Sequence, residues 1–302
     1  MNKRLIHLIG NPIAGGSALK RIHKAEQLLS QYGETVQIHM TKKAGDAETY
    51  ARQIAANTSP SAAQLIIAAG GDGTFNEVAN GLAGSSVAMA ILPFGTTSVL
   101  AREIGVPLND MEAAIHYALH EESRPISLGR IVLENGYHRL FLLMAGIGFD
   151  GEIVHNVKPA LKRLIGKGAY ALSTICSIFC YKPQQLRLTL TLEDGSIIET
   201  QGTSVIVSNA SRYGGDYVIT PNASLTTRSL EIMIDHSCRP SDFMKVLIAI
   251  GRQKKIPEAL YATVTSLRID GSSHIQVDGD ESGTTPAVID VVPESLRLVM
   301  KA

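Results

Sequence analysis

The sequence predicts an α/β domain built on a parallel sheet, followed by a β-rich sandwich domain. The chain has 302 residues, of which 45% are hydrophobic and 19% charged, and this length suits two domains of ~150 residues each. Up to about residue 125, short apolar runs alternate with longer amphipathic ones, as strands and helices do around a parallel sheet. Beyond Pro125, strand-like runs follow one another between Gly and Asn turns, which favours an antiparallel sandwich or barrel. We therefore predict domains over 1–125 and 126–302.

Strands and helices alternate in the first half. The predicted strands cover 5–10, 35–40, 65–69 and 87–92, each a short apolar run. The predicted helices cover 19–32, 46–57, a stretch from the glycine-rich turn after 65–69 to about Leu82, and 97–104. Gly33 ends the first helix, and Gly105 with Pro107 stops the last.

The second half consists mostly of predicted strands. They cover 130–133, 138–145, 186–192, 196–207, 230–235, 261–269 and 274–277. Two predicted helices interrupt them, 160–181 and 241–252. A last strand-like run, 296–300, could join either domain.

Charge and hydropathy exclude several classes of protein. Lys plus Arg and Asp plus Glu both number 28, so no positive field favours a nucleic acid, and we predict no nucleic-acid partner. The first ten residues lack the apolar core of a signal peptide, and no apolar run approaches the ~20 residues that span a bilayer. Cys176, Cys180 and Cys238 fit neither a disulfide framework nor a zinc spacing. These observations predict a soluble, cytoplasmic protein.

The most informative stretch is 65–77, LIIAAGGDGTFNE, a buried strand that runs through three glycines into a helix. Glycines let the backbone approach a ligand closely and point its amides at an anion, and the helix N-terminus favours phosphate. Thr74 and Glu77 have the spacing of a capping box. Asp72 would repel a phosphate unless a cation lay between them, which makes a Mg²⁺-nucleotide the natural ligand.

Two further glycine-rich turns follow predicted strands of the same half. They are NPIAGG at 11–16, after the first strand, and LPFGTTS at 92–98, after the fourth. In an open α/β sheet, loops at the carboxyl ends of neighbouring strands meet at one crevice. We therefore predict that all three turns face the same ligand.

These motifs carry a family resemblance. GGDGTFNEVANGL at 70–82, NPIAGG at 11–16 and LPFGTTSVLAREIGVP at 92–107 together resemble the diacylglycerol kinase catalytic-domain family, which includes bacterial lipid kinases and the sphingosine and ceramide kinases. Further family motifs follow in the same order: AGIGFD at 145–150, SN at 208–209, YGG at 213–215, PNA at 221–223 and VDGD at 277–280. The resemblance implies a three-layer, NAD kinase/diacylglycerol kinase-like first domain that binds ATP, and a second domain that shapes the acceptor side of an interdomain cleft.

The resemblance also implies roles for single residues. The family's nucleotide contacts match Asn11, Thr41, Gly70, Gly71, Asp72, Gly73, Thr74, Glu77, Gly95, Thr96 and Arg102. Asp72 is implied to organise Mg²⁺, directly or through water. Asp280, in a turn where the family has Asp-Gly-Glu, is implied to accept the proton of the acceptor hydroxyl with a side chain one methylene shorter. Asp150 is implied either to orient the acceptor or to stabilise the cleft.

Several positions depart from the family pattern. Gly16 replaces a basic residue of some members, Ser98 replaces the usual Asn, and a frequent Asp is missing around Ser127. The loop that holds a structural Mg²⁺ in some relatives reads TTRS at 226–229, so we predict no structural metal there. The departures alter the charge network but leave the Asp72 loop intact.

The acceptor implied by the resemblance is a lipid hydroxyl, of diacylglycerol, a sphingoid base or ceramide. The stretch 158–167 mixes four basic residues with apolar ones and precedes an apolar segment, which predicts peripheral contact with anionic lipids at the inner membrane face. Arg252, Lys254 and Lys255 form a second basic cluster, either for the same contact or as partners of a helix C-terminus. Three alternative functions are left open: an NAD kinase, a sugar kinase, and a catalytically weak lipid- or nucleotide-binding protein. A homodimer is also left open.

Overall fold

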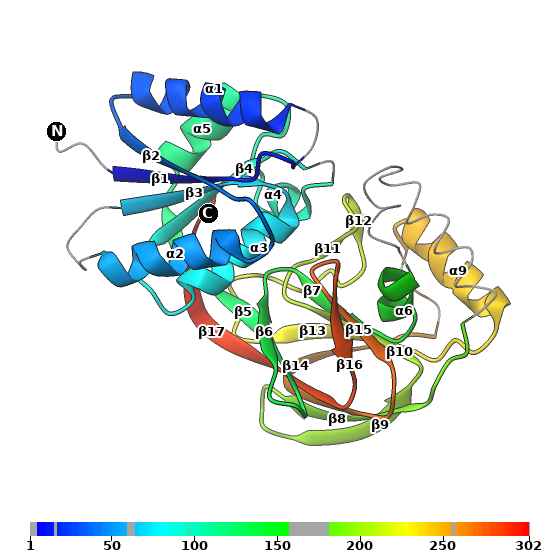
Figure 1. Cartoon of the computed structure of the whole chain (residues 1–302). Coiled ribbons are helices and arrows are strands. Elements are labelled where there is room, and N and C mark those ends of the chain that lie inside the picture. The colour runs from blue at the N-terminus through cyan, green and yellow to red at the C-terminus, as the bar shows by residue number, and fades with distance from the viewer. Residues whose placement is uncertain are drawn as a thin grey trace. The chain divides into compact units, whose positions relative to one another are not determined.

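A computed structural model describes residues 5–14, 17–58, 64–95, 97–156, 181–254, 256 and 258–301 (Figure 1). The chain divides into two compact units. Unit 1 runs to Leu128 and also contains Gly214–Asp216 and the residues from Pro293 onward. Unit 2 contains Gly129–Tyr213 and Tyr217–Val292.

Unit 1 is a three-layer α/β unit. Its strands are β1 (Leu5–Gly10), β2 (Thr35–Met40), β3 (Gln64–Gly70) and β4 (Ala88–Pro93), paired in parallel in the order β2-β1-β3-β4. Its helices are α1 (Ala18–Gln31), α2 (Asp46–Asn57), α3 (Asp72–Leu82), α4 (Val99–Glu103) and α5 (Met111–His120). Helices α1 and α5 pack together on one face of the sheet, and α2 and α3 pack together on the other (Figure 1).

Burial explains these elements. From Leu65 to Gly70 every residue of β3 is buried, as expected for a central strand that helices cover on both faces. In α1 the buried positions are Ala18, Ile22, Ala25 and Leu29, the spacing of one apolar helix stripe. The bounds predicted for the first two strands and for helix 46–57 match β1, β2 and α2.

Two predictions for unit 1 were wrong. No helix was predicted over α5, although Asp110 caps it: its carboxylate accepts the N–H of Ala113 at 3.0 Å. Helix α3 begins at Asp72 and is capped by Gly71, so Thr74 lies inside the first turn and forms no capping box with Glu77. Glu77 instead accepts the backbone N–H of Ala47, at the start of α2, at 3.1 Å.

Unit 2 is β-rich and largely antiparallel. Its strands are β5 (Ser123–Leu133, which begins in unit 1), β6 (His138–Phe141), β7 (Met144–Ile147), β8 (Leu186–Leu192), β9 (Ile197–Gly202), β10 (Ser204–Ser208), β11 (Arg212–Tyr213), β12 (Tyr217–Val218), β13 (Leu230–Asp235), β14 (Leu260–Asp270), β15 (His274–Val277), β16 (Asp280–Thr284) and β17 (Ala287–Val299, which ends in unit 1). Its helices are α6 (Phe149–Asn156) and α9 (Pro240–Gly251). Neighbouring strands follow the order β16-β15-β7-β10-β13-β14-β17, with β8 on β14 and β9 on β8. A large apolar cluster that includes Phe141, Val205, Ile232 and Leu267 forms the main core. The predicted fold class is confirmed.

Unit 2 differs from prediction at several places, and one predicted helix falls almost entirely outside the described residues. The run 138–145 breaks into β6 and β7, because the carboxylate of Asp278 accepts the N–H groups of Leu142, Leu143 and Met144. The run 196–207 breaks at Thr203, whose hydroxyl bonds the carbonyl of Ser237 at 2.8 Å. Helix α6 was not predicted. The helix predicted over 160–181 lies outside the described residues except for Tyr181, which is not helical.

The final strand continues from unit 2 into unit 1. Within unit 2, residues 287–290 of β17 pair antiparallel with β14. Within unit 1, Arg297 and Leu298 pair in parallel with β4. Over the described ranges, no helix combines the length and apolar character needed to cross a bilayer.

Candidate active site

The glycine-rich turns of unit 1 contact one another at the carboxyl ends of β1, β3 and β4. The backbone N–H of Asn11, after β1, donates to the carbonyl of Ala69 in β3 at 3.0 Å, and its side-chain amide donates to the hydroxyl of Thr74 at 3.4 Å. The N–H groups of Phe94 and Gly95, after β4, donate to the carbonyl of Gly70 at 2.7 and 3.2 Å. Backbone hydrogen bonds therefore hold the three turns at one sheet edge.

The absence of side chains at two glycines permits this approach. A Cβ on Gly95 would lie 3.0 Å from the Cα of Gly71, and a Cβ on Gly70 would lie 2.5 Å from the hydroxyl oxygen of Thr74. The first contact is with backbone, which cannot rotate away. Gly95 is therefore needed for the contact between the two turns.

Replacing Gly95 with alanine is expected to cost about 1–3 kcal/mol of unfolding free energy, the usual range for overpacking. Gly71→Ala is the matched control, because its Cβ would meet only the Cα of Gly95 at 3.7 Å, and its φ of −104° suits any residue. Thermal unfolding followed by circular dichroism measures both variants. Equal Tm values for the two would contradict the packing argument.

Asp72 connects two helices at this edge. It is the first residue of α3, and its carboxylate oxygens accept the N–H groups of Val99 and Leu100, in the first turn of α4, at 3.0 and 3.1 Å. Burial raises the pKa of Asp72, while the hydrogen bonds from Leu100 and Val99 lower it by a smaller amount. Asp72 therefore anchors the turn after β4 to the turn after β3, which the sequence did not indicate.

The surroundings of Asp72 fit a magnesium ion held through water. Both carboxylate oxygens already accept one N–H, but each has a second lone pair. Mg²⁺ commonly keeps several waters and is bound through one or two carboxylates together with substrate phosphates. The hydroxyl of Thr74 and the side-chain amide of Asn11, which bond each other at the same sheet edge, carry further oxygen atoms.

Ser98, which stands where the family has Asn, adopts the left-handed conformation with φ 46° and ψ 58°. Asn adopts this conformation more readily than Ser because its side chain can bond the local backbone. The hydroxyl of Ser98 instead donates to the carbonyl of Gly95 at 3.0 Å. Ser98 therefore holds the left-handed turn with a hydrogen bond of its own.

A cavity of about 580 Å³ in unit 1 adjoins the turn after β4. It is lined by Gly95, by Arg102 of α4, and by Arg21 and Lys24 of α1. The guanidinium of Arg102 donates to the carbonyl of Thr97 at 3.0 Å and pairs with Asp216 at 2.6 Å. Three cationic side chains beside a glycine-rich turn suit a polyphosphate.

Sequence reasoning missed Arg21 and Lys24. Arg21 donates to the carbonyl of Pro93 at 2.9 Å, and its guanidinium carbon lies 4.2 Å from the centre of the Phe94 ring. The available signal was the spacing of two cations by three residues, which places them on one helix face just after the first glycine turn.

The other predicted nucleotide contacts of unit 1 are distributed around the same edge. Thr41 follows β2, is buried, and donates its N–H to the carbonyl of Gly10 at 2.9 Å. Gly73 lies in the first turn of α3. Glu77 lies further along α3, bonded to α2 as described above. Thr96 lies outside the described residues.

In unit 2 the Asp278–Gly279–Asp280 turn joins β15 to β16. Asp278 has a φ of 48°, and its carboxylate accepts the N–H of Leu142 at 2.8 Å and those of Leu143 and Met144 at 2.9 Å. Asp280 begins β16 opposite Val277, and its side chain is exposed. Asp278 therefore holds the turn, and Asp280 lies at its exposed end.

Asp150 reaches the same turn through Gln276. The buried Asp150 carboxylate accepts the hydroxyl of Tyr213 and, at 2.6 Å, the side-chain amide of Gln276. The amide oxygen of Gln276 accepts the N–H of Gly279 at 2.7 Å. Burial raises the pKa of Asp150, and Gly146 makes room for it, because a Cβ there would overlap the carboxylate. Gln276 was missed because no pattern in the sequence marks it.

Comparisons with known proteins cover both units. Residues 5–131 match the diacylglycerol kinase catalytic domain, and residues 144–300 match the YegS C-terminal NAD kinase beta sandwich-like domain. The diacylglycerol kinase of Bacillus subtilis strain 168 is 29% identical over 301 residues, covering 97% of this chain and 95% of the relative. That of Mycobacterium tuberculosis strain H37Rv is 28% identical over 295 residues, covering 96% and 93%. A crystal structure of a diacylglycerol kinase from Bacillus anthracis strain Sterne superimposes with a TM-score of 0.76 at 28% identity, covering 99% of this chain and 97% of that one.

Proposed function

Because this chain belongs to the diacylglycerol kinase family and is a lipid kinase, we propose that it transfers the γ-phosphoryl group of ATP to the hydroxyl of a diacylglycerol-like lipid. The observation that carries this proposal is the contact among the turns after β1, β3 and β4, which gathers Asn11, the Gly70–Asp72 loop and Gly95 at one edge of a parallel sheet. Such an edge is where open α/β sheets bind nucleotides.

On the donor side, the residues of unit 1 position and neutralise the phosphates. The glycine turns bring backbone amides close to the phosphate oxygens, and the N-terminus of α3 adds favourable partial charge. Arg21, Lys24 and Arg102 supply positive charge from the adjoining cavity. Asp72 would hold Mg²⁺, which when bound would supply positive charge against the phosphates.

On the acceptor side, Asp280 takes the proton from the lipid hydroxyl as its oxygen attacks phosphorus. Its exposure leaves room for a bound hydroxyl within hydrogen-bond distance. Asp278 fixes the turn through three backbone N–H groups, and Gln276 fixes it through Gly279. These contacts restrict the Asp280 backbone, which supports transfer in a defined geometry.

Arg102→Ala is expected to raise the KM for ATP about tenfold, the loss of one charge-assisted hydrogen bond to phosphate. Asp216→Asn is the matched variant, because it removes the ion pair that Arg102 makes at 2.6 Å but leaves the guanidinium in place. Steady-state kinetics with varied ATP should give Asp216→Asn an unchanged or lower KM. An equal rise in both variants would show that Arg102 acts through Asp216 and not on the nucleotide.

We also propose peripheral contact with a lipid surface. The basic stretch 158–167 lies outside the described residues, so support comes from α9. Its Met244 and Ile248 side chains, one turn apart, are 44% and 47% exposed, and Arg252 and Lys254 follow directly. Apolar groups beside cations suit docking on anionic headgroups.

The function is tested with γ-labelled ATP, Mg²⁺ and a panel of diacylglycerol, monoacylglycerol, sphingosine, ceramide and NAD, with lipids presented in anionic or neutral vesicles. Label is expected in diacylglycerol, faster on anionic vesicles. Label in a sphingoid base or ceramide alone would overturn the proposed acceptor but keep lipid phosphorylation. Label in NAD alone, or in no acceptor, would overturn the proposed function.

A further inference from the structure

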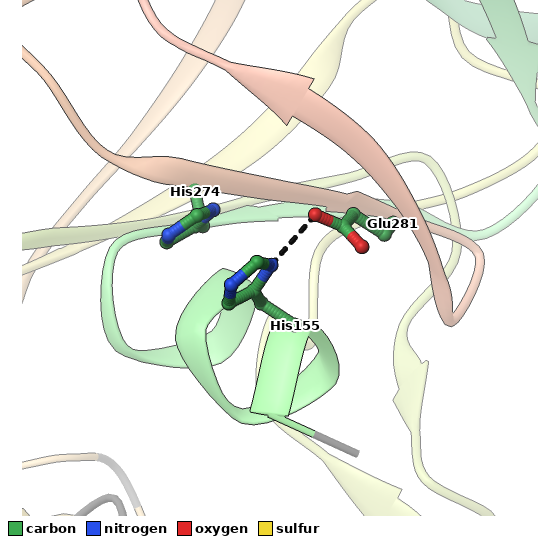
Figure 2. Close-up of side chains that lie close together, drawn as sticks. All are labelled: His155, His274 and Glu281. Carbon is green, nitrogen blue, oxygen red and sulfur yellow. Dashed lines mark hydrogen bonds and ion pairs between the residues drawn. The ribbon is translucent and has the colours of Figure 1, made fainter. Parts of the chain in front are cut away.

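Unit 2 holds a cluster of two histidines and a glutamate that the proposed reaction does not use. His155 comes from the end of α6, His274 from the start of β15 and Glu281 from β16 (Figure 2). Nδ1 of His155 lies 2.7 Å from a carboxylate oxygen of Glu281. The two imidazole rings stack with centroids 3.8 Å apart. One possible ligand atom from each residue lies within 4.8 Å of the other two.

The two ring nitrogens of His274 have different surroundings. Nε2 faces the carboxylate of Glu152 at 3.8 Å. Nδ1 is buried and makes no hydrogen bond to any described residue. A histidine that ligates a metal typically directs its second nitrogen to a carboxylate, which fixes the ring orientation. Glu152 stands on the Nε2 side of His274 at 3.8 Å, so a small side-chain adjustment would give His274 this arrangement.

We infer that His155, His274 and Glu281 bind a divalent transition-metal cation of the zinc class, with Glu152 positioning His274. Two imidazole nitrogens and one carboxylate oxygen form a donor set that suits Zn²⁺, whereas Mg²⁺ and Ca²⁺ prefer oxygen alone. Three protein ligands leave a fourth position for water. The side chains of His155, His274 and Glu281 are 41%, 30% and 51% exposed, so water can reach that position.

A simple ion pair does not account for the cluster. A pair of exposed charges such as His155 and Glu281 contributes little to stability, and it would leave Nδ1 of His274 buried without a partner. A cation between the three side chains gives every member of the cluster a favourable contact. The arrangement of all three residues, and not the ion pair alone, therefore points to a metal.

The site would connect α6 to the β15–β16 hairpin. Helix α6 contacts both strands, and Glu281 directly follows Asp280. A bound cation would therefore fix the hairpin that carries Asp280, and it would be distinct from the magnesium that accompanies ATP. The inference does not depend on the acceptor or on any phosphoryl transfer, because metal binding is measured without substrate.

The test is a titration of tag-free Cys238→Ser protein with Co²⁺, followed by visible absorption. Bound Co²⁺ is then displaced with Zn²⁺. The substitution removes the exposed Cys238 thiol, which could itself bind Co²⁺. One Co²⁺ per chain is expected, with the spectrum of a site of nitrogen and oxygen ligands. Glu152→Gln should weaken the affinity about 10–100-fold, and His155→Ala and Glu281→Gln should weaken it further. His155 and Glu281 are exposed, so both variants should fold.

His116→Ala provides the matched control, since His116 stacks on His120 in α5 with centroids 4.0 Å apart, but no described carboxylate joins that pair in a metal-ligand cluster. This variant should bind Co²⁺ as the parent does. Any of four results would overturn the inference. They are a lack of stoichiometric Co²⁺ binding, Co²⁺ binding that survives His155→Ala and Glu281→Gln, loss of Co²⁺ binding in His116→Ala, and a thiolate charge-transfer band in the spectrum.

Discussion

Replacing Asp72 with asparagine is expected to lower the rate of phosphoryl transfer by about 10²–10³-fold or more, because it removes the charge that we propose organises Mg²⁺. The structure makes this substitution informative. The side-chain oxygen of asparagine can still accept one of the two N–H groups of α4 that Asp72 now bonds. The helix connection is therefore largely preserved while the charge is removed, and kcat measured with diacylglycerol and Mg²⁺-ATP reports the chemistry.

Asp72→Ala is the comparison that separates catalysis from folding. It removes both hydrogen bonds to α4, so it should lose activity and also about 1 kcal/mol of unfolding free energy, the usual value of a helix cap. Asp72→Asn keeps one of the two hydrogen bonds, so it should lose the activity with a smaller loss of unfolding free energy than Asp72→Ala. If Asp72→Asn kept the wild-type kcat, Asp72 would be a purely structural link between the turns.

The pH dependence of stability provides an independent check on Asp72. Burial raises its pKa above the ordinary 3.8, so the native state binds more protons than the unfolded state between 3.8 and the raised pKa. The free energy of unfolding contributed by Asp72 therefore falls as pH rises through that window. Asp72→Asn lacks this decrease. Urea unfolding at several pH values should show the stability of the variant relative to wild type improving as pH rises.

Asp280→Asn is expected to lower kcat by about 10²–10⁴-fold, the usual contribution of a general base. The side chain is exposed, so the change in Tm should be small beside the loss of kcat, and the KM for ATP should not change. Asp280→Glu supplies the longer side chain that the family carries, and it should retain substantial activity. A wild-type kcat in Asp280→Asn would contradict the assigned role.

Asp278 is the matched control for Asp280, because it lies two residues away in the same turn. Its carboxylate accepts three backbone N–H groups of the segment between β6 and β7. Asp278→Ala leaves these buried donors without their acceptor, so it should lower Tm markedly. Asp278→Ala should mainly lose stability, whereas Asp280→Asn should mainly lose kcat. This difference distinguishes the roles of the two carboxylates.

Local patterns were sufficient for most of unit 1. The strands β1 and β2 and the helix α2 lie within the predicted bounds, because apolar runs and helix periodicity are properties of neighbouring residues. The strand breaks in unit 2 depend on distant partners. Asp278 splits the run 138–145 from more than 130 residues away, and no local signal shows this.

The candidate site likewise combines features that the local sequence indicates with contacts that it does not indicate. The contact among the glycine turns could be predicted because a close approach of backbone requires glycine at particular positions in the sequence. The connection of Asp72 to α4 and the link from Asp150 through Gln276 to Gly279 are tertiary contacts between segments 27 to 126 residues apart. Such contacts depend on the assembled fold, and so do the positions of Arg21 and Lys24 beside the cavity.

The most direct measurement is a single-turnover transfer with enzyme in excess over γ-labelled ATP, in the presence of Mg²⁺ and vesicles that contain diacylglycerol. We expect label to appear in phosphatidic acid at the rate at which it leaves ATP, and to stay in ATP with Asp72→Asn. Label that remained in ATP with the wild-type protein, or that appeared as inorganic phosphate at the same rate with and without the lipid, would contradict direct phosphoryl transfer from ATP to a lipid hydroxyl.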